Sequence, residues 1–274
     1  MAPLKDITLG RYIAAESPLH RLDPRTKIIG TLVLMTAVLL SPQFSSLILY
    51  CAFLALLVPL SRIRLGVFLR NLRPFVWLFG FTLVLWALWP PPLPYTVLWD
   101  LPYSDLVVTA EGLQRGAFFA LRLSVVIVTA SLLTLTTSPT ELTDGLERLL
   151  SPLRVIGFPA HELAMMVTIS LRFVPVLVDE AERLRKAQLA RGADFGGGPI
   201  RRARSLIPLL VPLFISAFTR ADRLALAMES RCYQGGAGRT HFRELELGRR
   251  DLLAGLAVAA AAALLLAVPV VLPL

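Results

Sequence analysis

The chain has 274 residues, of which 55% are hydrophobic and only 17% are charged, and its mean hydropathy is +0.67. Soluble domains carry about a quarter charged residues, so the composition argues against a soluble protein. The net charge of +9 would fit a nucleic-acid-binding protein, but no base-stacking motif or basic recognition helix accompanies it. The arginines are better explained as cytoplasmic loop charges of a membrane protein, some of them near anionic lipid.

Apolar runs without charge predict the membrane segments in chain order. Three such runs lack Asp, Glu, Lys and Arg: 28–60, 74–99 and 252–274. Runs near or above about 20 residues span a bilayer, and no cleavable signal peptide precedes them. We expect a hairpin over 28–60, turned at Ser41-Pro42-Gln43, whose first arm is short for a full crossing and is therefore either re-entrant or strongly packed. The two arms of this hairpin and the segments 74–89, 112–137 and 252–272 together make about five crossings.

The basic residues predict the side of the membrane that each segment faces. Four arginines lie in 61–73 and seventeen Lys/Arg in 138–250, whereas 74–114 has none. By the positive-inside rule, the N-terminus, the loop at 61–73 and residues 138–250 are cytoplasmic. The sequence therefore predicts an all-α, polytopic protein of the cell membrane. Its expected parts are a membrane region at 1–137, long cytoplasmic or interfacial helices in 138–250, and a last crossing in 251–274.

Arg122 lies within the predicted crossing 112–137, on roughly the same helix face as Arg115. A membrane arginine is costly and usually faces protein or reaches the headgroups. Two interpretations stay open. One is snorkelling or a helix-packing role, and the other is a specific contact with a partner.

Two long helices within 138–250 end in similar sequences. Apolar spacing predicts one helix from about His161 to Arg191 and another from about Ser205 to Tyr233. Residues 181–191 (AERLRKAQLAR) and 221–231 (ADRLALAMESR) share five identities at an offset of 40. Each helix is apolar in its first half and charged in its second. That pattern suits a helix that starts at the membrane and projects into the cytoplasm.

Both repeats place an arginine between small residues, in Ala190-Arg191-Gly192 and Ser230-Arg231-Cys232. One explanation is local, because an arginine in the last turn suits the unpaired carbonyls and negative charge of a helix end. The other is docking, because small flanks let the helix end enter a groove where the arginine reaches a carboxylate or carbonyl. The repetition favours docking, and two similar ends predict two similar receptors.

Motifs for catalysis and for cofactor binding are missing from the sequence. None of the three lysines follows glycine, so there is no Walker A loop. His161-Glu162 begins like a zinc-protease helix, but Met165 stands where the second histidine is required. There is no Gly-x-Ser-x-Gly elbow, and two cysteines make neither a disulfide framework nor a metal cluster. We expect no catalytic residue, no metal site, no cofactor and no nucleic-acid partner.

The chain resembles, over nearly its whole length, the transmembrane T component of energy-coupling factor (ECF) transporters, which are ABC-type micronutrient importers. Four segments carry the resemblance: 17–27 (SPLHRLDPRTK), 132–139 (LLTLTTSP), 187–195 (AQLARGADF) and 227–233 (AMESRCY). The last two look like the family's pair of small-Arg-small coupling motifs. The second departs from Ala-Arg-Gly, since Ser230 and Cys232 replace Ala and Gly, although both remain small.

The resemblance implies a non-catalytic subunit that lies in the lipid bilayer and has three protein partners. Two cytoplasmic ABC ATPase subunits would receive the two coupling helices, at Ala190, Arg191 and Gly192 and at Ser230, Arg231 and Cys232. A separate S component would bind the vitamin or metal ion and rest on the helices' apolar halves, at Met166, Phe173, Leu177, Leu210 and Phe214. Asp23, Pro24 and Arg25 would hold the N-terminal segment in place.

The competing hypothesis is a stand-alone permease that carries its substrate through its own helix bundle. It predicts polar cavity residues within the crossings. Polar side chains there are few, and most are the small hydroxyls ordinary in membrane helix packing. Acidic residues are nearly absent from the crossings, which also disfavours a proton- or sodium-coupled carrier.

Overall fold

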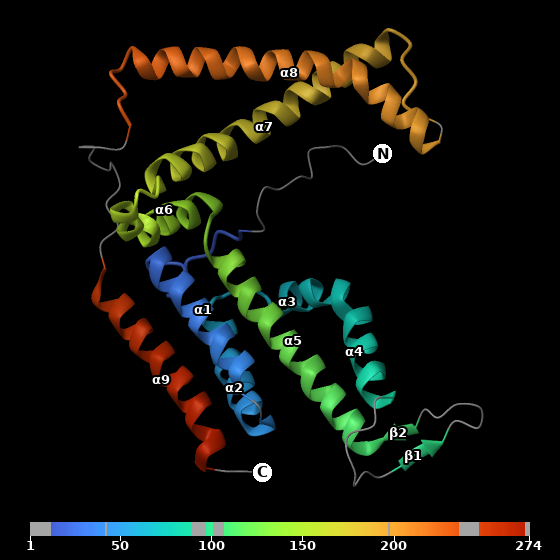
Figure 1. Cartoon of the computed structure of the whole chain (residues 1–274), viewed down its shortest axis with the longest axis vertical. Coiled ribbons are helices and arrows are strands. Elements are labelled where there is room, and N and C mark those ends of the chain that lie inside the picture. Colours follow the sequence, from blue (N-terminus) through green and yellow to red (C-terminus); the bar gives the residue numbers. More distant parts are fainter. Residues whose placement is uncertain are drawn as a thin grey trace. The chain divides into compact units, whose positions relative to one another are not determined.

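The computed structural model describes residues 12–41, 43–88, 97–100, 107–196, 198–235 and 247–271. Helices dominate it (Figure 1), in the order α1 (Pro24–Leu40), α2 (Phe44–Leu60), α3 (Leu65–Leu72), α4 (Val76–Leu88), α5 (Ala110–Thr136), α6 (Pro139–Leu150), α7 (Ala160–Ala190), α8 (Pro199–Glu229) and α9 (Arg249–Val271). Short 3-10 segments lie at Arg73–Phe75 and Ser151–Ile156, and one antiparallel strand pair, β1 (Val97–Asp100) with β2 (Val107–Thr109), precedes α5. The prediction of a helical membrane protein is confirmed.

The chain divides into two compact units. The membrane unit comprises the described residues of 10–145 and 245–274, with α1 to α5 and α9. The two-helix unit comprises those of 146–244, with α7 and α8. Helix α6 begins in the first unit and ends in the second.

The core of the membrane unit lies among α1, α2, α5 and α9. Its buried side chains include Leu34, Val38, Leu47, Tyr50, Leu54, Val125 and Leu265. Tyr50 is fully buried, and its hydroxyl shares a 2.9 Å hydrogen bond with that of Thr129. A polar group in this setting needs a partner within the protein because lipid supplies none.

The first hairpin turns where the sequence predicts. Helix α1 ends at Leu40, Ser41 is its C-cap and α2 begins at Phe44. Each arm has 17 residues, which is about 26 Å of helix. Both arms are therefore shorter than the roughly 30 Å hydrocarbon core, and the expected short first arm is confirmed.

Five helices of the described chain are long and apolar enough to cross a bilayer: Leu65–Leu88, Ala110–Thr136, Ala160–Ala190, Arg204–Glu229 and Arg249–Ala267. Three of them contain the predicted crossings 74–89, 112–137 and 252–272, apart from a residue or a few at their ends. The other two are α7 and most of α8, which stand in place of the two short hairpin arms. Length and composition alone do not distinguish a crossing from a long helix whose first half is apolar.

Two predicted boundaries are wrong. Most of the predicted loop at 61–73 is the helix α3, an amphipathic helix that buries Phe68, and the chain continues through a 3-10 turn with Pro74 in its first turn. Helix α8 begins at Pro199 rather than near Ser205 and ends at Glu229. Proline is favoured at the first helical position because no intrahelical N–H is needed there.

Helices α4 and α5 pack with their backbones unusually close. A Cβ atom on Gly112 would lie 2.6 Å from the carbonyl oxygen of Trp86, and one on Gly116 would lie 3.0 Å from the Leu83 Cα. Glycines four residues apart permit such an approach between membrane helices. Gly112 and Gly116 carry this pattern in the sequence, where it was not predicted.

Buried polar groups tie the N-terminal segment to later helices. The Asp23 carboxylate accepts the N–H of Arg25 at 2.9 Å, and the Asp23 N–H donates to the Asp251 carboxylate at 2.7 Å. The Lys27 Nζ donates to the carbonyl of Thr136 at 3.1 Å. These bonds join Asp23 to α9 and Lys27 to α5, as expected of residues that hold the N-terminal segment in place.

Arg122 is held by its own chain. Its Nη2 donates to the carbonyl of Ser41, the C-cap of α1. Its guanidinium carbon lies 4.7 Å and 5.7 Å from the ring centroids of Phe118 and Phe119. A helix-end carbonyl and an aromatic face both attract a cation. Of the two interpretations, these are the contacts of a helix-packing residue.

Candidate docking site at two helix ends

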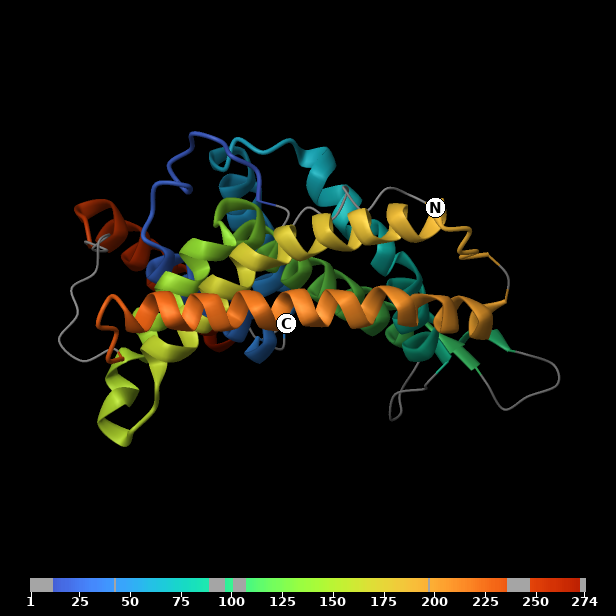
Figure 2. The same cartoon turned by 90° about the horizontal axis from the view of Figure 1, so that it is seen from above.

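The two-helix unit consists mainly of two helices of equal length that run in opposite directions. Helices α7 and α8 have 31 residues each. Figures 1 and 2 show that their C-terminal ends point to opposite ends of the pair. The two predicted arginine motifs therefore lie apart, one at each end.

The two helix ends close with the same backbone hydrogen bonds, 40 positions apart. With the N–H donor first, the bonds are Gly192 to Leu189 (3.0 Å) and Ala193 to Gln188 (2.9 Å) after α7, and Cys232 to Glu229 (2.9 Å) and Tyr233 to Met228 (3.0 Å) after α8. This pair of bonds is a Schellman motif, in which a left-handed residue ends the helix. The sequence repeat is therefore also a repeat of structure.

The backbone conformation after each arginine explains the glycine of the first motif but not the cysteine of the second. Gly192 has φ +84° and Cys232 has φ +57°, a region that glycine enters freely and other residues enter at a cost. A Cβ on Gly192 would meet no atom within 4 Å, so the backbone and not crowding favours glycine there. The helix turn thus accounts for Gly192 without a partner, whereas Cys232 adopts the same conformation at a cost. It does not account for Ala190 and Ser230.

All six predicted docking residues are exposed. Across the described part of the chain, no ion pair involves the guanidinium of Arg191 or of Arg231. Each end therefore presents a cation at the close of a helix, next to a sharp left-handed turn. Such a group can donate several hydrogen bonds to a carboxylate or to carbonyls of another protein.

The apolar halves of α7 and α8 are largely uncovered. Met166, Leu210 and Phe214 are 52%, 46% and 60% exposed, while Phe173 and Leu177 are half-buried. Most side chains in the apolar stretch of α8 are exposed or half-buried, and Leu209 is buried. Apolar surface of this extent marks contact with lipid or with another protein.

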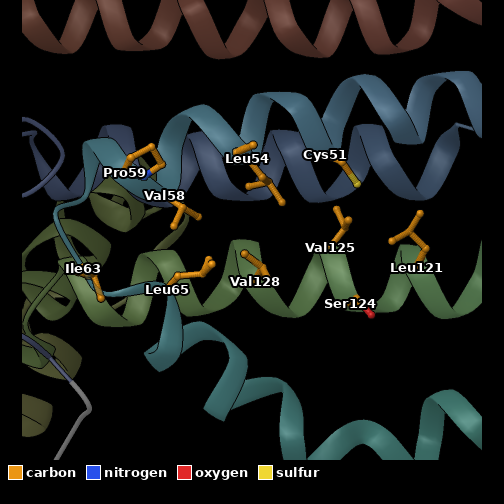
Figure 3. Close-up of a pocket in the computed structure, with 11 residues that line it drawn as sticks. Cys51, Leu54, Val58, Pro59, Ile63, Leu65, Leu121, Ser124, Val125 and Val128 are labelled. Atoms are coloured by element: carbon orange, nitrogen blue, oxygen red, sulfur yellow. The ribbon is translucent and has the colours of Figure 1, made fainter.

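A groove of about 620 Å³ lies between α2, α5 and the start of α3 in the membrane unit (Figure 3). Its lining is Cys51, Leu54, Ala55, Val58, Pro59, Ile63, Leu65, Leu121, Ser124, Val125 and Val128. Among these side chains only Cys51 and Ser124 carry a polar atom, and the Ser124 hydroxyl donates to Ala120 at 2.8 Å. The groove suits an acyl chain or an apolar side chain rather than a polar solute.

A second cavity of about 370 Å³ lies among α1, α2, α5 and α9. Its lining is mostly leucine and alanine, with Lys27 and Arg250 among its polar side chains. Lys27 already donates to two backbone carbonyls. Within the described residues no group of three or more His, Cys, Asp or Glu could hold a metal ion.

The comparison with known proteins decides the family. Residues 15–242 match the sequence profile of the CbiQ family, described as cobalt transport protein. An energy-coupling factor transporter transmembrane protein EcfT from Thermanaerovibrio acidaminovorans is 49% identical over 257 residues, which is 93% of each chain. The EcfT protein of Bacillus subtilis is 42% identical over 249 residues, or 90% of this chain and 92% of its own.

The chain belongs to the CbiQ/EcfT family. The resemblance drawn from the four sequence segments is thus confirmed, and the chain is a multi-pass membrane component of ECF-type transport. The matched region includes both Schellman ends, so the repeat lies within the part that the family shares.

Proposed function

We propose that this chain is the non-catalytic coupling subunit of an ECF importer, with one cytoplasmic ABC ATPase subunit at each arginine end. The observation that carries the proposal is the repeat, because two helix ends with the same hydrogen bonds fit two receptors of similar shape. The ATPases are cytoplasmic, so both arginine ends face the cytoplasm, and the basic residues of the N-terminal segment place the N-terminus on the same side. The clustering of basic residues in 138–250 agrees with that side.

The exposed apolar halves of α7 and α8 then form the surface on which the substrate-binding S component rests. Met166, Phe173 and Leu177 belong to this surface on α7, and Leu210 and Phe214 belong to it on α8. ATP-driven movement of the ATPases reaches the S component through these helices, and a vitamin or metal ion enters with it. This chain itself needs no substrate site.

The cavities favour this proposal over the stand-alone permease. A permease needs polar groups that replace the hydration of its substrate inside the membrane. The larger groove has an apolar lining, and Lys27 in the smaller cavity is engaged by carbonyls of its own chain.

Charge reversal at the helix ends tests the docking. In the full complex, Arg191→Glu and Arg231→Glu should each weaken co-purification with the ATPase subunits by at least about tenfold, as expected for a central interface arginine. The double variant should abolish ATP-driven uptake. Arg223→Glu is the matched control, because Arg223 is an exposed arginine of α8 away from its end. Undiminished ATPase association in the double variant would exclude docking through these arginines.

A further inference from the structure

Helices α7 and α8 meet at equivalent positions of the repeat. The Nη2 atom of Arg220 lies 2.5 Å from the Oε2 atom of Glu180, and 40 positions separate the two residues. Forty is also the offset of the sequence repeat and of the two Schellman ends. The ion pair therefore joins one position of the first repeat to the same position of the second.

Contact between equivalent positions has a geometric meaning. In a two-fold arrangement a residue meets its own equivalent only beside the axis. Helices α7 and α8 run in opposite directions (Figures 1 and 2), as a two-fold axis between them requires. Arg191 follows Glu180 by eleven residues, and Arg231 follows Arg220 by the same eleven. Each arginine end thus lies about 16 Å along its helix from the contact.

The charges at this position differ in the way that such a contact requires. An identical charged residue in both repeats would meet a like charge at the axis. Here one repeat has Glu180 and the other has Arg220, whereas Arg183 and Arg223, three positions further along, are the same. The two repeats differ where self-contact occurs and share an arginine nearby.

We propose that Glu180 and Arg220 are positioning residues that fix the crossing point of α7 and α8 and so keep the two arginine ends at equal distances from it. The inference rests on the proposed function. Partners that move the two ends then turn the helices about a fixed point, and the movement reaches the apolar halves beyond it. Without the ion pair the helices slide past each other and part of the movement is lost.

Charge reversal and charge exchange test this role in the complex with both ATPases and the S component. The variants are Glu180→Arg, Arg220→Glu and the double exchange, which restores opposite charges at the same positions. The control is Glu182→Arg, which breaks the 3.2 Å pair of Glu182 with Lys186 within α7. The readouts are ATPase co-purification, substrate taken up per ATP hydrolysed, and the distance between spin labels.

The spin labels go on Ala187→Cys and Ala227→Cys, which are exposed, equivalent positions near the two ends. The label background replaces the native cysteines, with Cys51→Ser and Cys232→Gly. Each single reversal should keep ATPase association, broaden the label distance distribution and lower uptake per ATP by about fivefold or more, the lower end of coupling between sites. The double exchange should restore both quantities, and the Glu182→Arg control should change neither.

Unchanged distances and uptake in the single reversals would overturn the proposal, and so would a double exchange that fails to restore them. Loss of ATPase association in the single reversals would overturn it too, because the pair would then act in docking. If the proposed function is wrong, a different experiment shows it: the double variant Arg191→Glu, Arg231→Glu keeps normal ATPase association. The distance between the spin labels can also be measured in the chain without its partners. It therefore tests the role of the ion pair whether or not the proposed function holds.

Discussion

Cys232 holds a left-handed backbone conformation that the equivalent Gly192 adopts without a side chain. A side chain in that region costs about 1 kcal/mol or more. We therefore predict opposite effects of two substitutions. Gly192→Ala should lower the thermal unfolding midpoint of the purified protein, and Cys232→Gly should raise it, each by the equivalent of about 1 kcal/mol.

Intrinsic fluorescence during heating in detergent measures both changes. Gly66→Ala is the control, because Gly66 lies in a helix with no positive φ and with open space around its Cβ position. A loss of stability from Cys232→Gly would contradict the statement that the left-handed backbone of Cys232 costs stability.

The positions of Arg191 and Arg231 were predictable from the sequence because the two arginines occupy equivalent positions of the repeat, 40 residues apart. The left-handed turns after them were not predicted, because a φ angle follows from how a helix ends and not from residue size alone. Arg122 was ambiguous for a related reason. Its acceptor, the carbonyl of Ser41, lies 81 positions away along the chain, and no local pattern connects the two residues.

Among elements, the contact between α4 and α5 gives the sharpest packing prediction. A Cβ at Gly116 would press on backbone atoms of Leu83 at 3.0 Å, and backbone moves less readily than a side chain. Gly116→Ala should therefore lower the unfolding midpoint by the equivalent of about 1–3 kcal/mol, as overpacked sites do. The measurement is again thermal unfolding in detergent.

Gly80→Ala on α4 is the matched control, since no atom lies within 4 Å of its Cβ position. It should be neutral or stabilising, because alanine is the better helix former. Equal losses in the two variants would mean that any glycine replacement in this pair is harmful, and close packing would not be the reason.

Long apolar helices were the elements that the sequence predicted well. Helix α5 runs from Ala110 to Thr136 against a prediction of 112–137, and the first hairpin turns at the expected residues. Helix α3 was missed because an eight-residue amphipathic helix has no long apolar run. The strands β1 and β2 were missed because each has only three or four residues. Hydropathy detects burial in lipid and is insensitive to such short elements.

For the whole molecule, the proposed function predicts which activities the isolated chain lacks. Purified alone and reconstituted in lipid vesicles, it should neither take up a vitamin or metal ion nor hydrolyse ATP, because its sequence has no phosphate-binding loop and the larger groove among the described residues has an apolar lining. Vesicles that also contain two ATPase subunits and an S component should show ATP-dependent uptake, measured with labelled substrate. Uptake by the chain alone would support the permease.

The division into two units was the least predictable feature of the chain. The basic residues predicted a cytoplasmic segment at 138–250, and the repeat predicted two similar helix ends within it. Nothing in the repeat says that α7 and α8 run in opposite directions, because that depends on the turn after Arg191 and on the contact of Glu180 with Arg220. These are relations between helices, and apolar periodicity describes one helix at a time.

The bonds that hold the N-terminal segment bear on how the protein is made. The Lys27 Nζ donates to the carbonyl of Thr136, 109 positions later in the chain. The N–H of Asp23 donates to the carboxylate of Asp251, 228 positions later. Synthesis runs from the N-terminus, and a buried polar group without a partner is costly. We therefore expect the start of α1 to stay in contact with water until α5 and then α9 have been synthesised. The buried bond of the Asp23 N–H can form only after α9 has supplied the Asp251 carboxylate.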